Sequence, residues 1–172
     1  MRDLVAYEIE FTDPAMASWA LLRQTWAAAS KTAETKLARV GLTPEKAAIL
    51  WACRSYPGLL TPAELGRLLF RESQTVIGLL NRMERDGLVR RIPKRKGRPF
   101  TEIRLTSKGS VLSEVGADVY GKLIAEIMGD LPEREQFHGT LRALRQRMLD
   151  QIHVSLETVS CSSVADTHAG RH

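Results

Sequence analysis

The amino-acid sequence predicts a mainly helical fold with one small β-hairpin. An Asp-Pro or Thr-Pro pair stands three times directly before apolar residues at helical spacing, and such pairs are typical helix starts. Two short segments, 88–93 and 100–105, alternate apolar with polar or charged residues as strands do. With 172 residues, the chain is long enough for one domain with a hydrophobic core.

Four helices are predicted before the hairpin. The first covers 13–41 and ends at a glycine, which adopts the left-handed conformation that closes many helices. The second covers 43–58, and the third is the short segment 61–70. The fourth runs over 73–86 and stops at Gly87 for the same reason as the first.

Two further helices are predicted after the hairpin. One is capped by Thr106 and runs to about Met128, and the other begins at 131–133. The last helix carries an apolar stripe made of Phe137, Leu141, Leu144, Met148 and Ile152. Residues 1–12 are expected to form an irregular arm, and residues 154–172 a disordered polar tail.

Positive charge is concentrated in the middle of the chain. The net charge is +5 and the pI is about 9.5. Between residues 43 and 110 there are fourteen lysines and arginines against six acids, so this segment carries +8 and the rest −3. Residues 90–98 hold six cations and no acid. A polyanionic partner would offset the repulsion among these charges.

A helix, a turn, a helix and a hairpin with a basic tip together make a winged helix-turn-helix. The fourth helix is expected to bury Val76, Leu79, Leu80 and Met83 and to insert its polar face into the major groove of DNA. The predicted DNA contacts of this helix are Ser73, Gln74, Thr75, Ile77, Asn81, Arg82 and Arg85. Those of the hairpin tip, against the backbone or the minor groove, are Lys94, Arg95, Lys96 and Arg98.

Individual side chains on this helix suggest individual roles. Gln74 and Asn81 suit adenine, Arg82 suits guanine or a phosphate, and Ile77 suits a thymine methyl group. Gly78 costs about 1 kcal/mol in a helix interior relative to alanine. Close approach to DNA, close approach to a neighbouring helix and simple tolerance of glycine are three explanations that the sequence leaves open.

These segments resemble the MarR (multiple antibiotic resistance regulator) family of bacterial transcription factors. The resemblance rests on "LTPEKAAIL", "TPAELGRLL", "SQTVIGLLNRMERDGLVRR" and "RLTSKG", of which "NRMERDGLVRR" and "IRLTSKG" are the most specific. It implies a homodimer built by the first, fifth and sixth helices, repression through a palindromic double-stranded DNA operator, and release by a phenolic or lipophilic small-molecule effector. Residues 13–41 and 110–153 would then dimerise, and residues 42–109 would bind DNA.

The wing departs from the usual family pattern. Family wings commonly read Asp-x-Arg-Asp-x-Arg, whereas this one reads "KRKGRPF" without an aspartate. Arg98 matches the wing-tip arginine that reaches the minor groove. The additional positive charge predicts DNA binding that is tight and sensitive to salt.

The resemblance also points to an effector site. Trp19, Arg23 and Trp26 share one side of the first helix, and Trp51 lies on the second, near where family ligands bind. Stacked indoles with one cation would suit an aromatic acid, while packing of the tryptophans in a dimer core is the simpler explanation.

Cysteine usage leaves a redox alternative open. Cys53 and Cys161 make no disulfide framework, which favours a reducing cytoplasm. Cys53 could sense oxidants if its thiol were exposed and its pKa low, whereas a buried thiol would be inert.

Other function classes find little support. The chain contains no glycine-rich phosphate loop, HExxH or GxSxG motif, no spacing typical of a zinc site, and no apolar run long enough for a membrane span, so neither an enzyme nor a cofactor is predicted. A winged-helix protein-interaction or architectural module remains the alternative to a DNA-binding regulator, and it would need an apolar outer face on the fourth helix.

Overall fold

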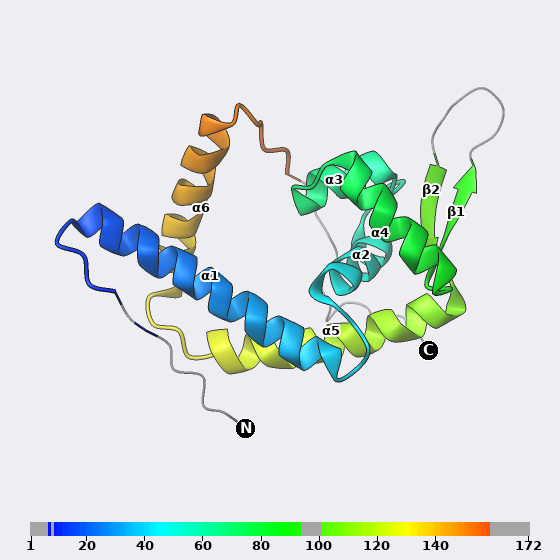
Figure 1. Cartoon of the computed structure of the whole chain (residues 1–172), viewed down its shortest axis with the longest axis horizontal. Helices are drawn as coiled ribbons and strands as arrows, with labels where there is room; N and C mark the ends of the chain where they lie inside the picture. Colours follow the sequence, from blue (N-terminus) through cyan, green and yellow to red (C-terminus); the bar gives the residue numbers. More distant parts are fainter. Residues whose placement is uncertain (1–6, 8, 94–100, 159–172) are drawn as a thin grey trace.

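The structure is a computed structural model that describes residue 7, residues 9–93 and residues 101–158. Within these residues it contains six helices and a two-stranded hairpin, as predicted (Figure 1). The elements are α1 (Pro14–Ala38), α2 (Pro44–Ser55), α3 (Pro62–Leu69), α4 (Ser73–Arg85), β1 (Val89–Pro93), β2 (Thr101–Leu105), α5 (Ser107–Met128) and α6 (Arg134–Gln151). The predicted hairpin tip, most of the N-terminal arm and most of the predicted tail lie outside the described residues.

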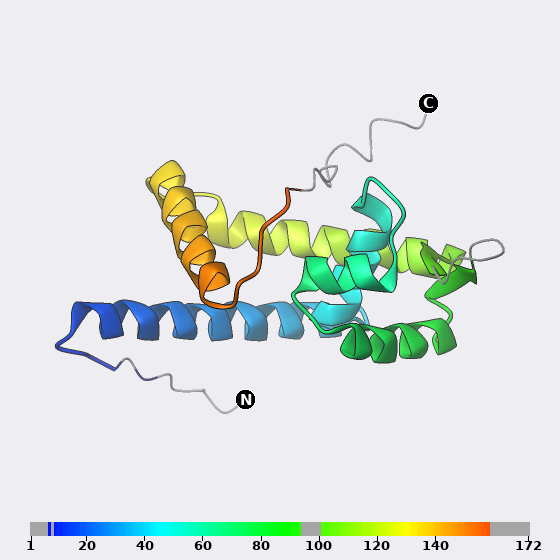
Figure 2. The same cartoon turned by 90° about the horizontal axis from the view of Figure 1, so that it is seen from above.

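Two long helices connect the two ends of the molecule. α1 and α5 run side by side, and α2, α3, α4 and the hairpin form a lobe at one end of the pair (Figures 1 and 2). α6 lies at the opposite end, away from the hairpin in both views. The lobe with the hairpin and the helix α6 therefore lie at opposite ends of the protomer.

Side-chain caps explain where the first three helices start. The Asp13 carboxylate accepts hydrogen bonds from the backbone N–H groups of Ala15 and Met16. The hydroxyls of Thr43 and Thr61 each accept from the N–H three residues later, and proline occupies the first position of all three helices. These caps satisfy N–H groups that the helix itself leaves unpaired, so the sequence predicted the starts correctly.

The hydrophobic core lies in the lobe. Leu50, Leu65, Leu80 and Met83 are fully buried there, and they come from α2, α3 and α4. α1 contributes through its last turns, where Leu37 is fully buried. The lobe can therefore hold α4 and the hairpin in a fixed relation, while the remainder of α1 packs far less of its surface.

One junction connects α4, both strands and α5. Gly87 ends α4 with φ 69°, in the left-handed region where glycine is favoured. The Thr106 hydroxyl donates to the Gly87 carbonyl at 2.6 Å and accepts from the Gly109 N–H at 3.0 Å, which caps α5. The Thr106 N–H donates to the Leu88 carbonyl at 3.1 Å. A side chain at position 109 would overlap that same carbonyl, so Gly109 is required by packing.

The hairpin has a regular register and a third partner. Val89 pairs with Leu105 and Pro93 with Thr101 in an antiparallel ladder. The Ile103 N–H also donates to the Leu60 carbonyl at 2.9 Å, which attaches β2 to the segment before α3. This attachment was not predicted, because a single paired residue leaves no periodic pattern in the sequence.

The prediction for the sixth helix needs one correction, at its start. α6 begins at Arg134 rather than at 131–133, since Glu133 adopts a left-handed conformation with φ 51° and cannot continue a helix. The predicted apolar stripe is largely exposed on the protomer: Phe137, Leu141 and Met148 are exposed, and Leu149 is the buried residue of α6.

Replacing Gly109 by alanine is expected to destabilise the lobe by several kcal/mol, on the order of a severe core substitution. The added methyl group would collide with the Leu88 backbone, which cannot rotate away as a side chain can. Urea unfolding followed by circular dichroism would measure the loss. An unchanged unfolding midpoint would show that the α4–β1 turn is not held against α5.

Candidate nucleic-acid interface

α4 presents one apolar and one polar face. Val76, Leu80 and Met83 are buried, and Leu79 packs partly buried against the core, as the sequence predicted. The seven predicted DNA-contact residues of this helix are all exposed: Ser73, Gln74, Thr75, Ile77, Asn81, Arg82 and Arg85. The predicted contacts at the hairpin tip, Lys94, Arg95, Lys96 and Arg98, lie outside the described residues.

The side of α4 opposite the core forms a continuous ridge. Gln74, Gly78, Asn81 and Arg85 recur at intervals of three or four residues, so they follow one face of the helix. We call these four residues the outer ridge. A Cβ atom added at Gly78 would meet no other atom of the described chain within 4 Å. Close approach to a neighbouring helix of the same protomer therefore does not explain this glycine.

An ion pair fixes the base of the hairpin against α4. The Glu84 Oε2 atom accepts hydrogen bonds from the Arg91 side chain, at 3.0 Å from Nε and 2.7 Å from Nη2. The other oxygen, Oε1, accepts from the Arg91 backbone N–H at 3.0 Å. The side-chain hydrogen bonds from Arg91, followed by the backbone one, lower the pKa of Glu84. Glu84 is thus ionised at neutral pH, with both oxygens engaged by one arginine.

Sequence reasoning missed this pair. Glu84 and Arg91 lie on two elements separated by a turn, so neither helical nor strand periodicity places them together. The contact between them can be recognised only when β1 is known to fold back along α4 after Gly87. A search for opposite charges on either side of a helix-ending glycine would have been the available signal.

Asp86 anchors the end of α4 to two other helices. Its carboxylate accepts a hydrogen bond from Lys46 Nζ on α2 at 2.7 Å, and its carbonyl accepts from Lys108 Nζ on α5 at 2.9 Å. The Lys46 hydrogen bond is the main reason why the pKa of the Asp86 carboxyl is lowered. These contacts are exposed and contribute orientation more than stability.

The outer face of the hairpin base carries two opposed arginines. Arg90 and Arg104 are direct cross-strand partners, and both are exposed. Glu102 on the same face accepts a hydrogen bond from Arg104 Nε at 2.7 Å, which raises the pKa of that arginine. Like charges directly opposite each other are unfavourable in a sheet, so an anion near this face would be stabilising.

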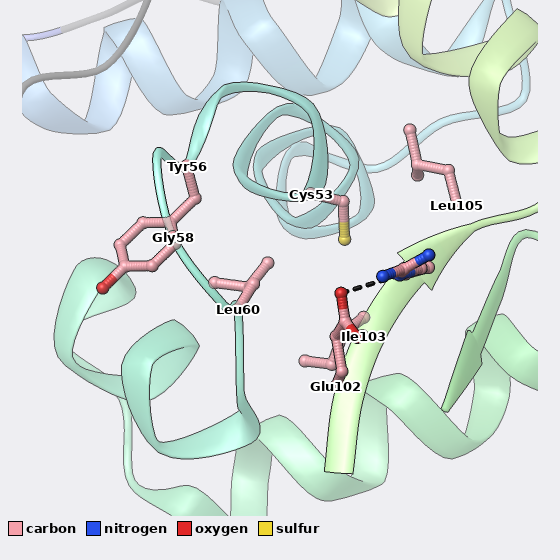
Figure 3. A pocket seen from close by; sticks show the side chains of 8 residues that line it. Cys53, Tyr56, Gly58, Leu60, Glu102, Ile103 and Leu105 are labelled. Atoms are coloured by element: carbon pink, nitrogen blue, oxygen red, sulfur yellow. Dashed lines mark hydrogen bonds and ion pairs between the residues drawn. The ribbon is translucent and has the colours of Figure 1, made fainter. Parts of the chain in front are cut away.

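A hollow of about 320 Å³ lies between α2 and β2, and Cys53 lines it (Figure 3). The Cys53 side chain points toward β2, while Tyr56 and Leu60 come from the α2–α3 connection. Burial raises the pKa of the Cys53 thiol to about 12, so almost none of it is thiolate at neutral pH. This environment favours an inert cysteine over a redox sensor.

The predicted effector residues are exposed on the surface of the protomer. Trp19 and Trp26 are exposed on α1, 52% and 72% respectively, and Trp51 on α2 is 39% exposed. Arg23 is also exposed. The hollow beside Cys53 and another between α4 and β1 are lined by other side chains. The assignment of Trp19, Arg23, Trp26 and Trp51 to an effector site stays a prediction.

Comparison with known proteins decides the family. Residues 40–98, which span the helix-turn-helix and run into the wing, match the sequence model of the MarR family. This part of the chain belongs to the MarR family. It therefore has the helix-turn-helix sequence of MarR-family DNA-binding transcriptional regulators. No curated protein sequence matches the chain significantly.

Solved structures extend the likeness beyond the matched segment. The organohalide-sensing regulator RdhR, bound to 2,4-dichlorophenol, superposes with a TM-score of 0.74 at 22% identity, over 93% of this chain and 96% of that one. MepR of S. aureus in complex with DNA gives 0.67 at 24% identity, over 83% and 99%. CouR of Rhodococcus jostii RHA1, bound to p-coumaroyl-CoA, gives 0.65 at 15% identity, over 86% and 100%. At these identities the likeness shows a shared fold, and its coverage extends to the long helices α1, α5 and α6.

In the part of the chain that the structure describes, no group of three or more His, Cys, Asp and Glu side chains is arranged to hold a metal ion. Among the same residues, no helix combines the length and the apolar character that crossing a bilayer requires.

Replacing Gly78 by alanine is expected to raise the free energy of unfolding by about 1 kcal/mol, because alanine is the better helix former and has free space here. Operator binding is expected to weaken, because the methyl group would stand on the ridge that faces DNA. Urea unfolding and fluorescence anisotropy would measure the two effects on one protein. Unchanged DNA affinity with increased stability would mean that DNA stays clear of position 78.

The Cys53 thiol is expected to react with a disulfide reagent at pH 8 at least about 100-fold more slowly in the native protein than in urea, because so little thiolate is present. A Cys161→Ser background makes Cys53 the single thiol. Rapid labelling of the folded protein, together with loss of DNA binding after peroxide treatment, would restore the redox alternative. A Cys53→Ser variant that resists peroxide would confirm that outcome.

Proposed function

We propose that the protein is a homodimeric repressor that binds a palindromic double-stranded DNA operator and releases it when an aromatic or lipophilic small molecule binds. Each protomer inserts α4 into a major groove, and the two half-sites are about one helical turn apart. The hairpin lies against the adjoining backbone or minor groove, with Lys94, Arg95, Lys96 and Arg98 as its contacts. The polar outer face of α4, beside a hairpin base fixed by Glu84 and Arg91, carries the proposal.

The character of α4 favours DNA over a protein partner. An interaction module would need an apolar patch on the outer face, but Ile77, 38% exposed, is the one large apolar side chain exposed on this helix. The remaining exposed positions offer hydroxyl, amide and guanidinium groups that match base edges and phosphates. MepR, which shares the fold, was solved in complex with DNA.

The homodimer is supported by apolar side chains that the protomer leaves exposed on its long helices. α6 buries Leu149 but exposes most of its apolar stripe, and a helix this poorly packed gains little from its own chain. Exposed large apolar residues of α1, α5 and α6 include Met16, Trp19, Leu21, Trp26, Val111, Val115, Ile124, Ile127, Phe137, Leu141 and Met148. So many on one part of a soluble protein indicate an interface, and residues 13–41 and 110–153 are proposed to form it.

The effector is proposed from chemistry and from the relatives. RdhR was solved with 2,4-dichlorophenol and CouR with p-coumaroyl-CoA, and both ligands contain a phenolic ring. Trp19, Trp26 and Trp51 supply aromatic surface, and Arg23 supplies a cation for an acidic group. Their exposure in the protomer fits a site that is completed by the second copy.

Selection from random duplexes, followed by sequencing and repeated at two salt concentrations, tests the proposed regulator. We expect enrichment of a palindrome with half-sites about one helical turn apart. Salt-sensitive binding with no enriched motif would instead support the architectural alternative. Aromatic acids and halogenated phenols would then be screened for release of the enriched duplex.

Replacing Leu141 by glutamate is expected to convert the dimer into a monomer, because the carboxylate would be buried at the proposed interface. Operator affinity would fall with it, since each monomer reads only one half-site. Analytical ultracentrifugation measures the mass. Phe70→Glu is the matched control: this side chain is 60% exposed at the end of α3, outside the proposed interface, so the dimer should persist. If both variants remained dimeric, or if both became monomeric, the assigned interface would be contradicted.

A further inference from the structure

A second hollow, of about 360 Å³, opens between α4 and β1 and is lined by Asn81, Glu84, Arg85 and Arg91. We call it the α4–β1 hollow. Two of its residues, Asn81 and Arg85, belong to the outer ridge of α4, so the hollow opens on the side that is proposed to face DNA. The other two are the ion pair that attaches β1 to α4.

The hollow offers donors for an anion. Asn81 contributes an amide, and Arg85 and Arg91 contribute guanidinium groups. Among the described residues, the side chains of Asn81 and Arg85 form no hydrogen bond or close ion pair, although the charge of Arg85 contributes to lowering the pKa of Asp86. Arg91 uses two of its guanidinium N–H groups on Glu84 and keeps the remainder, which point away from that carboxylate. Phosphate oxygens are the acceptors that such forked donors match best.

Glu84 would ordinarily oppose an anion at this place. Both of its oxygens are occupied by Arg91, however, and the two cations of the hollow outnumber this single acid. The contacts of Glu84 hold both the backbone and the guanidinium of Arg91, so they set the direction of the arginine. Glu84 therefore acts as a positioning residue, and Arg91 as the residue positioned.

The position of the hollow along α4 indicates whether it would contact the bases or the phosphate backbone of DNA. The N-terminal residues of a groove-binding helix reach the base edges first. Asn81 and Arg85 lie in the last turns, next to the strand that leads into the wing, where a straight helix leaves the curved groove. The backbone of the DNA, rather than a base, is the partner within reach there.

From this geometry we infer that the α4–β1 hollow binds one DNA phosphodiester per half-site, with Asn81, Arg85 and Arg91 as donors. The inference rests on the proposed function and refines it. Asn81 becomes a phosphate contact rather than an adenine contact, and base reading is confined to the N-terminal half of α4, Ser73 to Ile77. Arg91 and Glu84 join the set of residues on which operator binding depends.

Affinity measurements over a salt series, on the selected operator and on a scrambled duplex, test the assignment. Arg85→Gln and Arg91→Gln are expected to weaken binding to both duplexes by the same factor and to reduce the salt slope by about one unit each. Gln74→Ala is the matched control from the same ridge and should weaken binding to the operator alone. Arg85 is exposed and forms no hydrogen bond or close ion pair with another described residue, so its variant remains informative if Arg91→Gln is unstable.

Two results would overturn the inference: an unchanged salt slope in both arginine variants, or a loss confined to the operator. Replacing single operator phosphates by neutral methylphosphonates then locates the contact. At one position per half-site the wild-type protein should lose more affinity than Arg85→Gln, which has already lost one of the three donors to that phosphate. If the effects of the methylphosphonate and of Arg85→Gln on affinity are additive at every position instead, no phosphate occupies the hollow.

Glu84→Gln tests the positioning role through the sign of its effect. If Glu84 only repels DNA, removing its charge strengthens binding. If it orients Arg91, the same change weakens binding, and the double variant with Arg91→Gln is no weaker than Arg91→Gln itself. These outcomes are separate from failure of the proposed function, in which the wild-type protein would select no operator at all.

Discussion

At Thr106, four backbone segments meet: the end of α4, the start of β1, the end of β2 and the start of α5. One hydroxyl group donates to the Gly87 carbonyl and accepts from the Gly109 N–H. The absence of a side chain at position 109 lets α5 approach the Leu88 carbonyl. The direction of the hairpin relative to α4 depends on this contact, and so does every DNA contact that combines the two elements.

Ion pairs then hold α4 and the hairpin in the orientation that this junction sets. Asp86 holds the end of α4 to α2 and α5, and Glu84 holds the base of the hairpin through Arg91. Exposed ion pairs stabilise a fold only slightly, so their value here is positional. They also leave the outer ridge with amide and guanidinium groups and without an acid, as a surface for a polyanion requires.

Most of the fold could be predicted from the sequence, because neighbouring residues determine where most of its helices and strands begin and end. Asp13, Thr43 and Thr61 cap helices, Gly87 ends one, and alternation marks the strands. The start of α6 was misjudged, since nothing near Glu133 signals its left-handed conformation. The exposed residues of α4 follow from helical periodicity, whereas the Glu84–Arg91 pair and the contact of Leu60 with Ile103 are tertiary and leave no periodic trace.

The length of α5 has a mechanical consequence. Its 22 residues extend over about 33 Å, from the junction at Thr106 to the end of the molecule where α6 lies. A tilt of about 5° at one end would displace the other by about 3 Å over that length, without any change inside the core of the lobe. In a dimer, two such lever arms set the separation of the recognition helices. A small molecule bound between the long helices would therefore change the distance between the two recognition helices without altering the core of either lobe.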